Sequence, residues 1–216
     1  LWRSERKRKV AFALAEGLQC NGTAAHEHYF SHPNRLLYFD TRTRRESLIK
    51  ESELSVRLNH FLKGGPIRLA FSGRLIGMKG ADHLISVAHG LREQGIDFHL
   101  NIYGTGEMEE KIQMDIQNLQ LNNHVTMHGS VDFDSHLIPE IKSSVDLYVM
   151  LHRQSDPSCT YLETLACGIP IVGYDNKALT GILKRADVGF SVPMDDIKGV
   201  ISTIKRLSSN RQMLNM

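Results

Sequence analysis

A polar loop followed by a short helix carries the residues of this chain that are best suited to bind an anion. The stretch 155–172 begins with polar residues, continues into an amphipathic segment that contains Glu163, and ends in an apolar run. Gly168 is placed to end the helix, and Pro170 prevents its return before a strand begins. Phosphate at the positive start of this helix and sugar hydroxyls on Glu163, one turn further in, would fit this arrangement.

Backbone groups at the start of this helix are the predicted phosphate contacts. Ser158, Cys159 and Thr160 are candidate N-cap residues,. We expect the N–H groups of Thr160 and Tyr161 to stay unblocked and to face the phosphate. Capping alone explains the same residue types. A thiolate nucleophile at Cys159 is disfavoured, because no histidine partner for it can be identified in the sequence.

A second loop, 72–80, follows an apolar run and brings two cations to one place. Its glycines, including Gly73, let the backbone approach a ligand, and Arg74 and Lys79 supply positive charge. Ligands of parallel α/β sheets bind beyond the carboxyl ends of the strands, so a diphosphate is the ligand that this loop favours. Two solvated charges in a glycine-rich turn are the plain alternative.

The loop 103–109 contains Gly104, Thr105 and Gly106, which look like the start of a dinucleotide-binding fingerprint. The third glycine of that fingerprint is missing, because Glu109 stands in its place, and the loop follows the second apolar run rather than the first. The sequence therefore disfavours a nicotinamide-dependent oxidoreductase. For Thr105, a ligand contact and an ordinary strand-to-helix turn both stay open.

The turn after the next apolar run contains His128 and Gly129. An imidazole at this position could stack on a nucleotide base or form a hydrogen bond with it. A single histidine at a strand end is more often a structural residue with protein partners of its own. Both interpretations of His128 stay open at the level of the sequence.

The elements that position these loops follow from the apolar pattern after residue 66. Amphipathic stripes over 84–91, 108–119 and 197–207 predict helices,. Short apolar runs without alternation lie between the stripes, as expected of strands buried on both faces. The alternation predicts an α/β fold with a doubly wound, Rossmann-like parallel sheet. The predicted strands are 67–71, 98–103, 125–128, 146–150, 169–174 and 189–192.

Residues 1–63 follow a different pattern. We predict a helix over 5–15, strands at 17–22 and 36–40, and a charged helix over 41–62,. This partial βα segment and its linker are too small to close a hydrophobic core of their own.

The stretch around Glu163 resembles the nucleotide-sugar site of retaining GT-B glycosyltransferases of group 1, a family 4-like class. In that family a Glu, seven further residues and a second Glu precede a small-residue run with Gly-x-Pro. Glu163 matches the second Glu, and Ala-Cys-Gly-Ile-Pro-Ile-Val at 166–172 matches the run. The first Glu does not match, because Ser155 stands eight positions earlier and Asp156 is the nearest carboxylate.

The two glycine-containing loops strengthen this resemblance. Arg74 and Lys79 match a Gly-Arg…Lys-Gly loop in which the family binds pyrophosphate, and Gly104-x-Gly106 matches a loop near the nucleotide. The turn at His128 and Gly129 corresponds to one that lies against the base. The resemblance implies a GT-B C-terminal, nucleotide-sugar-binding domain over 64–216. It also implies that 1–63 is the end of the N-terminal acceptor domain and the hinge.

The resemblance implies transfer of a sugar from a nucleoside-diphosphate sugar to an acceptor hydroxyl, with retention at the anomeric carbon. Arg74 and Lys79 would stabilise the departing diphosphate. Glu163 would hold ribose hydroxyls. At the missing first Glu, either Asp156 would replace it beside the donor sugar, or the donor sugar would differ. The implied acceptor is a saccharide or a lipid-linked molecule, as in polysaccharide biosynthesis. No cofactor and no metal are implied.

Other activities share parts of this pattern. A GT-B sugar epimerase or phosphorylase has the same fold. A non-catalytic nucleotide-sugar-binding subunit is favoured by Ser155 in place of the first Glu.

Composition narrows the class of protein further. A net charge of +2 and a pI near 8.5 do not indicate a nucleic-acid partner,. Three cysteines without a Cys-x-x-Cys pair and the absence of a secretory signal favour reduced thiols and a cytoplasmic protein,.

Two further clusters have weaker functional interpretations. His26, His28 and His32 could share a face if the first two lay on a strand, but the spacing of a complete metal site is lacking,. The basic residues 3–9 could give peripheral membrane contact with anionic lipid, although a solvated helix face explains them as well,.

Overall fold

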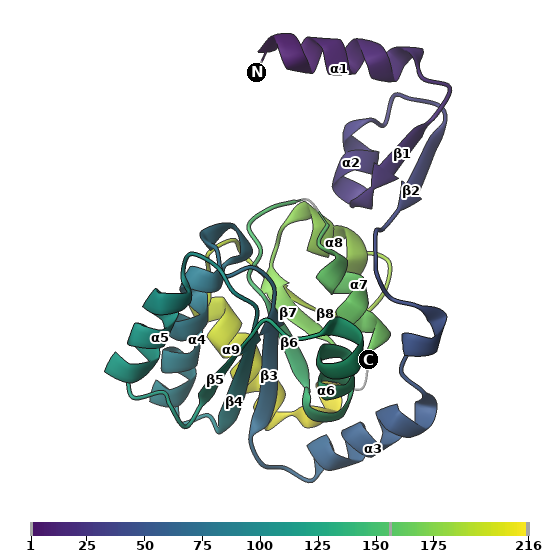
Figure 1. Ribbon diagram of the computed structural model, residues 1–216. Helices are drawn as coiled ribbons and strands as arrows, with labels where there is room; N and C mark the ends of the chain where they lie inside the picture. The colour runs from purple at the N-terminus through teal and green to yellow at the C-terminus, as the bar shows by residue number, and fades with distance from the viewer. Residues whose placement is uncertain (1, 156, 215–216) are drawn as a thin grey trace.

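The computed structural model describes residues 2–155 and 157–214. Within these residues, a larger body is built on a parallel sheet, and a smaller unit lies beyond one end of it (Figure 1). The strands of the sheet run upward in Figure 1, so their carboxyl ends face the smaller unit. None of the helices in the described part of the chain combines the length and the apolar character needed to cross a bilayer.

The sheet of the larger body has six parallel strands in the order β5-β4-β3-β6-β7-β8. This is the doubly wound order, in which the chain reverses its direction of winding between β3 and β6. The predicted α/β class and Rossmann-like sheet are confirmed, and each predicted strand starts and ends within two residues of the observed one. The strands are β3 (Ile67–Ser72), β4 (Phe98–Tyr103), β5 (Val125–Gly129), β6 (Leu147–Met150), β7 (Ile171–Tyr174) and β8 (Gly189–Val192).

Helices cover both faces of this sheet and form two separate cores. The helices α4 (Ala81–Glu93), α5 (Glu109–Asn118) and α9 (Ile197–Ser209) pack on one face, and α6 (Ile138–Ser144), α7 (Cys159–Ala166) and α8 (Lys177–Leu183) on the other. Successive strand residues point to opposite faces, so Leu69 and Phe71 enter the first core and Ala70 the second,. Burial of each large side chain contributes about 1.5–3 kcal/mol. The short helix η4 (Arg211–Leu214) closes the described chain.

The smaller unit contains α1 (Trp2–Leu14), β1 (Leu18–Asn21), α2 (Gly22–His28) and β2 (Arg35–Tyr38). The two strands pair in parallel, and α2 forms the crossover between them. Its contact with the larger body runs from α2 to α8, where the Thr23 hydroxyl donates to the Lys177 carbonyl at 2.9 Å. The strand geometry considered for His26 and His28 is wrong, because both lie on α2.

The chain between the two bodies descends along one side of the sheet domain (Figure 1). A helix over the whole of 41–62 is not formed, and this prediction is wrong for 41–50 apart from the short turn η1 (Arg45–Ser47). An extended course lets this segment span the body before α3 (Glu51–Leu62) begins. Helix α3 is fastened by Arg57, a buried side chain that donates to the carbonyls of Cys167 and Gly168 at 2.8 and 2.5 Å.

Candidate functional site

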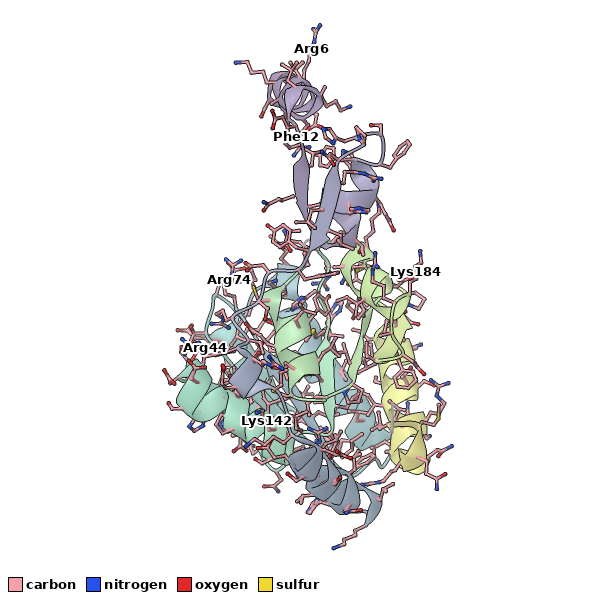
Figure 2. The ribbon with its side chains drawn as sticks, turned by 90° about the vertical axis from the view of Figure 1, so that its right-hand side faces the viewer. Arg6, Phe12, Arg44, Arg74, Lys142 and Lys184 are labelled. Carbon is pink, nitrogen blue, oxygen red and sulfur yellow. The ribbon has the colours of Figure 1, made fainter. Side chains whose placement is uncertain are left out.

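The loop after β3 lies at the carboxyl end of the sheet, beside the point where the winding reverses. Gly73 opens it in a left-handed conformation, Arg74 is exposed, and the turn η2 (Gly77–Lys79) places half-buried Lys79 just before α4. Figure 2 shows Arg74 at the end of the domain that faces the smaller unit. The two predicted phosphate-binding cations therefore follow the strand on one side of the switch point, where α/β sheets bind ligands.

The loop after β4 packs directly on the loop after β3. A Cβ on Gly104 would overlap the Gly73 carbonyl oxygen, and one on Gly106 would lie 2.5 Å from the Leu75 carbonyl oxygen. The Leu75 N–H donates to the carbonyl of Thr105 at 2.9 Å. The two glycines thus allow a close backbone approach, and Thr105 contributes its carbonyl to the same contact. This geometry favours the structural interpretation of the Gly-x-Gly loop.

His128 and Gly129, at the end of β5, have protein partners. The His128 imidazole stacks on Tyr103 at 4.5 Å, and its Nε2 lies 2.8 Å from the Asn101 amide oxygen. Burial lowers the pKa of His128. The Gly129 carbonyl accepts a hydrogen bond from the Gly104 N–H at 2.7 Å. This turn is therefore tied to the β4 loop, and His128 fits the structural interpretation.

The loop after β6 contributes residues that the sequence did not single out. Arg153 contacts the β3 loop through both its main chain and its side chain. His152 is buried, near Lys79 and edge-on to the Tyr161 ring, with both ring nitrogens unpartnered among the described residues. Burial, and then the Lys79 charge, lower the pKa of His152 to about 3. The imidazole is therefore neutral near pH 7.

Helix α7 has a predicted N-cap residue before its first turn and the predicted glycine after its last one. Ser158 is the N-cap residue, although its side chain does not cap the helix. At the other end, the N–H groups of Gly168 and Ile169 donate to the carbonyls of Leu165 and Thr164, which is a Schellman motif,. The positive φ of Gly168, 66°, gives the left-handed residue that this motif needs.

The start of α7 differs from the expectation in one respect. The Tyr161 N–H was expected to be unblocked, but it donates to the Ser158 carbonyl at 3.1 Å. Thr160 lies in the first turn, and its hydroxyl oxygen accepts from the Ser158 hydroxyl. The buried Tyr161 hydroxyl accepts from the Asn176 amide at 3.0 Å. Tyr161 thus anchors the helix to the loop after β7.

Glu163 is paired with a residue that sequence reasoning missed. Its carboxylate accepts two hydrogen bonds from Arg42, from Nε to Oε1 at 2.8 Å and from Nη2 to Oε2 at 3.2 Å. The Arg42 guanidinium also lies 4.1 Å from the ring centroid of Phe133, in the π-helical turn η3 (Phe133–Leu137). The contact joins residues that are 121 positions apart, and no local sequence signal indicates it.

The remaining candidate residues add little to the site. Asp156 lies outside the described residues. Burial, and then the nearby Asp40 carboxylate, raise the pKa of the Cys159 thiol, which does not suit a thiolate nucleophile,. Among residues 2–155 and 157–214, no group of three or more His, Cys, Asp or Glu side chains could hold a metal ion.

Comparison with known proteins gives a family match over most of the chain. Residues 56–216 match the family described as glycosyl transferases group 1. Among curated proteins, the chain is 24% identical over 157 residues to the putative colanic acid biosynthesis glycosyltransferase WcaL of Salmonella typhimurium. That alignment covers 67% of this chain and 37% of WcaL, so the chain spans little more than a third of this relative.

Solved structures share the fold at low sequence identity. A mutant of S. aureus TarM in complex with fondaparinux, alpha-GlcNAc-glycerol and UDP has a TM-score of 0.74 at 16% identity, covering 98% of this chain and 41% of that one. Anabaena Alr3699/HepE in complex with UDP has a TM-score of 0.73 at 16% identity, covering 95% and 57%. The fold that these structures share with the chain is the Rossmann-like C-terminal domain of GT-B proteins.

Proposed function

This chain belongs to the glycosyl transferases group 1 family, and on that premise we propose that it binds a nucleoside-diphosphate sugar and forms the donor side of a glycosyltransferase. The observation that carries the proposal is the meeting of the β3, β4 and β6 loops with the start of α7 at the switch point of the sheet. We propose that residues 64–216 form the donor domain. Residues 1–63 would be the end of the acceptor domain and the hinge.

The reaction breaks the bond between the anomeric carbon and the diphosphate, and negative charge grows on the departing group. Arg74 and Lys79 would stabilise that charge, assisted by the positive start of α7. The buried His152 imidazole near Lys79 is neutral near pH 7, so it adds no positive charge of its own. The acceptor hydroxyl forms the new bond and releases its proton. Retention at the anomeric carbon and a saccharide or lipid-linked acceptor are part of the proposal on the strength of the family resemblance.

Glu163 would accept hydrogen bonds from the two ribose hydroxyls. The carboxylate has the chemistry for this role, but Arg42 donates a hydrogen bond to each of its oxygens. The proposed ribose contact therefore requires Arg42 to move. Thr160 would lie near the phosphates, and Gly73 would bring the β3 loop close to them.

A calorimetric titration of this chain with UDP, GDP, ADP, CMP and NAD tests the proposal, with a thermal-shift assay in parallel. A ligand that binds only the folded state raises the melting temperature by mass action. The proposal expects saturable binding of one nucleoside diphosphate and no binding of NAD. Binding of NAD alone, or of none of the five, would contradict it.

A second candidate function is a non-catalytic nucleotide-sugar-binding subunit. Two observations favour it: Ser155 stands where the family has its first Glu, and Glu163 is engaged by Arg42. The full-length protein separates the two functions. Release of nucleoside diphosphate from a nucleotide sugar in the presence of acceptor supports the enzyme, whereas binding of the nucleotide sugar without turnover supports the subunit.

A further inference from the structure

Arg153 connects three loops at the carboxyl end of the sheet. Its guanidinium donates to both carboxylate oxygens of Asp82, at 2.7 and 2.9 Å, and its Nε donates to Asp195 at 2.6 Å. The same side chain donates to the carbonyl of Gly77, and the Arg153 N–H donates to the carbonyl of Met78 at 3.1 Å. Two successive carbonyls of the turn that carries Lys79 are therefore held by this one residue.

The turn is held on both sides of Lys79, by Arg153 before it and by Leu151 after it. The turn ends at Gly80, whose φ is 73° and whose Cβ, if it had one, would overlap the backbone of Leu151. The β3 and β6 loops are thus in backbone contact two residues before Arg153. Because Lys79 lies between the held carbonyls and Gly80, its Cα has little freedom to move.

All three nitrogens of the Arg153 guanidinium contact other residues of the chain. The hydrogen bonds that Arg153 donates to Asp82 and Asp195 raise the pKa of Arg153, and its Nη2 also contacts the His83 ring. With Nε, Nη1 and Nη2 all engaged, few donors remain for a phosphate. We propose that Arg153 is a positioning residue that holds the Lys79 turn in its phosphate-binding geometry. The proposal rests on the proposed function and names a residue that serves it.

A double-mutant cycle on UDP binding, repeated with GDP and ADP, tests this role. Arg153→Met, Lys79→Met and the double variant are compared with the wild-type chain by calorimetry. If Arg153 acts through Lys79, Arg153→Met weakens binding about tenfold in the wild-type chain and less than about twofold in the Lys79→Met chain. Equal weakening in both backgrounds would overturn the proposal.

Arg68 offers a matched control at the opposite end of the same two strands. Its side chain donates to both oxygens of Asp146, which lies just before β6, so it too joins β3 to β6 through a carboxylate. Arg68→Met should lower stability and leave UDP affinity unchanged. If Arg153→Met does not fold, Arg153→Lys provides the cycle, because lysine keeps the charge and loses the bidentate geometry. Failure of the wild-type chain to bind any of the three nucleotides would overturn the proposed function instead.

A different observation concerns the opposite end of the site. Only 5% of the Glu163 side chain is exposed, whereas 63% of the Arg42 side chain is exposed. The two hydrogen bonds approach the carboxylate end-on, which is also how a pair of vicinal hydroxyls would bind it. A buried carboxylate needs a partner, and Arg42 is that partner in this structure,.

The segment that carries Arg42 lies across the start of α7. Phe39 packs against the core of that face, and the Asp40 carboxylate lies 3.8 Å from the Cys159 sulfur in the first turn of the helix. Arg42 then reaches Glu163 and the Phe133 ring. The segment thus places a carboxylate near the proposed phosphate position and a guanidinium at the proposed ribose position.

We infer that Arg42 covers Glu163 until the ribose of a nucleotide displaces it. The inference rests on the proposed function. Displacement lowers the apparent affinity for the nucleotide, because only the fraction of molecules with an open Glu163 can bind the ribose. Removal of the Arg42 guanidinium should therefore strengthen binding of a ribonucleotide, which is the opposite of the effect expected from an arginine that binds the ligand.

Calorimetry with two forms of each nucleotide separates these outcomes. Arg42→Met is titrated with UDP, GDP and ADP and with their 2′,3′-dideoxy forms, and Arg44→Met, an exposed cation on the same segment, is the control. Arg42→Met should tighten ribonucleotide binding about threefold to tenfold and leave dideoxynucleotide binding unchanged. Hydrogen exchange at 39–43 should rise when the wild-type chain binds the ribonucleotide.

Two results would overturn this inference while the proposed function stands. Arg42→Met could weaken binding of the ribonucleotide, or it could change the ribonucleotide and dideoxynucleotide affinities by the same factor. The second result would mean that Arg42 and the ribose do not compete for the Glu163 carboxylate. Absence of binding to the wild-type and Arg42→Met chains alike would overturn the proposed function itself.

Discussion

The two ends of the candidate site are held in opposite ways. At the phosphate end, Arg153 and the glycine contacts join loops of the sheet domain to one another. At the ribose end, Glu163 is held by Arg42, which comes from the segment between the two bodies. Contacts within one domain preserve a geometry, whereas a contact from a connecting segment can be exchanged for a ligand. The phosphate end is thus organised in advance, and the ribose end is covered.

Gly104→Ala should have the largest effect, because it breaks the packing at the phosphate end. The new Cβ would overlap the Gly73 carbonyl, and the φ of 121° is unfavourable for alanine. We expect the free energy of unfolding to fall by about 3–5 kcal/mol in urea denaturation. Gly129→Ala is the control, with a φ of 67° but open space around its Cβ, and should cost about 1–2 kcal/mol,. Equal losses would show that the loop contact is not tightly packed.

Lys79→Met should have the largest effect on the ligand. The loss of a charge-assisted contact with the diphosphate should weaken UDP binding about 10- to 100-fold in calorimetry. Ser155→Ala, at the position of the family's missing Glu, should change UDP affinity less than about twofold. Unchanged UDP affinity in Lys79→Met would contradict the role of Lys79 as a phosphate contact. The comparison between the phosphate end and the ribose end would then lose its first half.

His152 should make stability depend on pH. Its pKa is about 3 in the folded chain against an ordinary value of 6.5, so the unfolded chain binds the proton first as the pH falls. The contribution of the neutral imidazole to the free energy of unfolding is fully present above pH 6.5. It falls by about 1.4 kcal/mol per pH unit between pH 6.5 and 3. His152→Phe should remove this slope from urea denaturation curves. An unchanged slope would contradict the burial of a neutral imidazole at this position.

Cys159→Ser should have the smallest effect. The raised pKa of the thiol and its place beside Asp40 give Cys159 no part in the phosphate contact. UDP affinity should stay within about twofold and the free energy of unfolding within about 0.5 kcal/mol. A large loss of affinity on this change would mean that the start of α7 binds the ligand through the thiol.

The sheet could be predicted from the sequence because its strands are buried on both faces. Runs such as 67–71 and 98–103 are continuous in apolar character, and this signal is local,. The helices α2, α6 and α8 were not predicted, because each has seven residues and too few turns for a clear stripe. The extended course of 41–50 was missed because its charged composition also suits a helix.

The sequence predicted the loops of the candidate site, but it did not predict the side chains that contact them. The position of Arg74 and Lys79 follows from strand order, which periodicity reveals. The contacts of Arg153 with Asp82 and of Arg42 with Glu163 join residues 71 and 121 positions apart, and only the folded chain brings them together. The engagement of the Tyr161 N–H depends on the exact first turn of α7, which a capping pattern does not determine,.

A crystal structure of this chain with the nucleoside diphosphate that binds it most tightly would test the central claim most directly. We predict that the diphosphate lies at the Lys79 turn, that the contacts of Arg153 are unchanged, and that ribose hydroxyls replace Arg42 on Glu163. A nucleotide bound elsewhere, or bound here with the Arg42–Glu163 pair intact, would contradict the account.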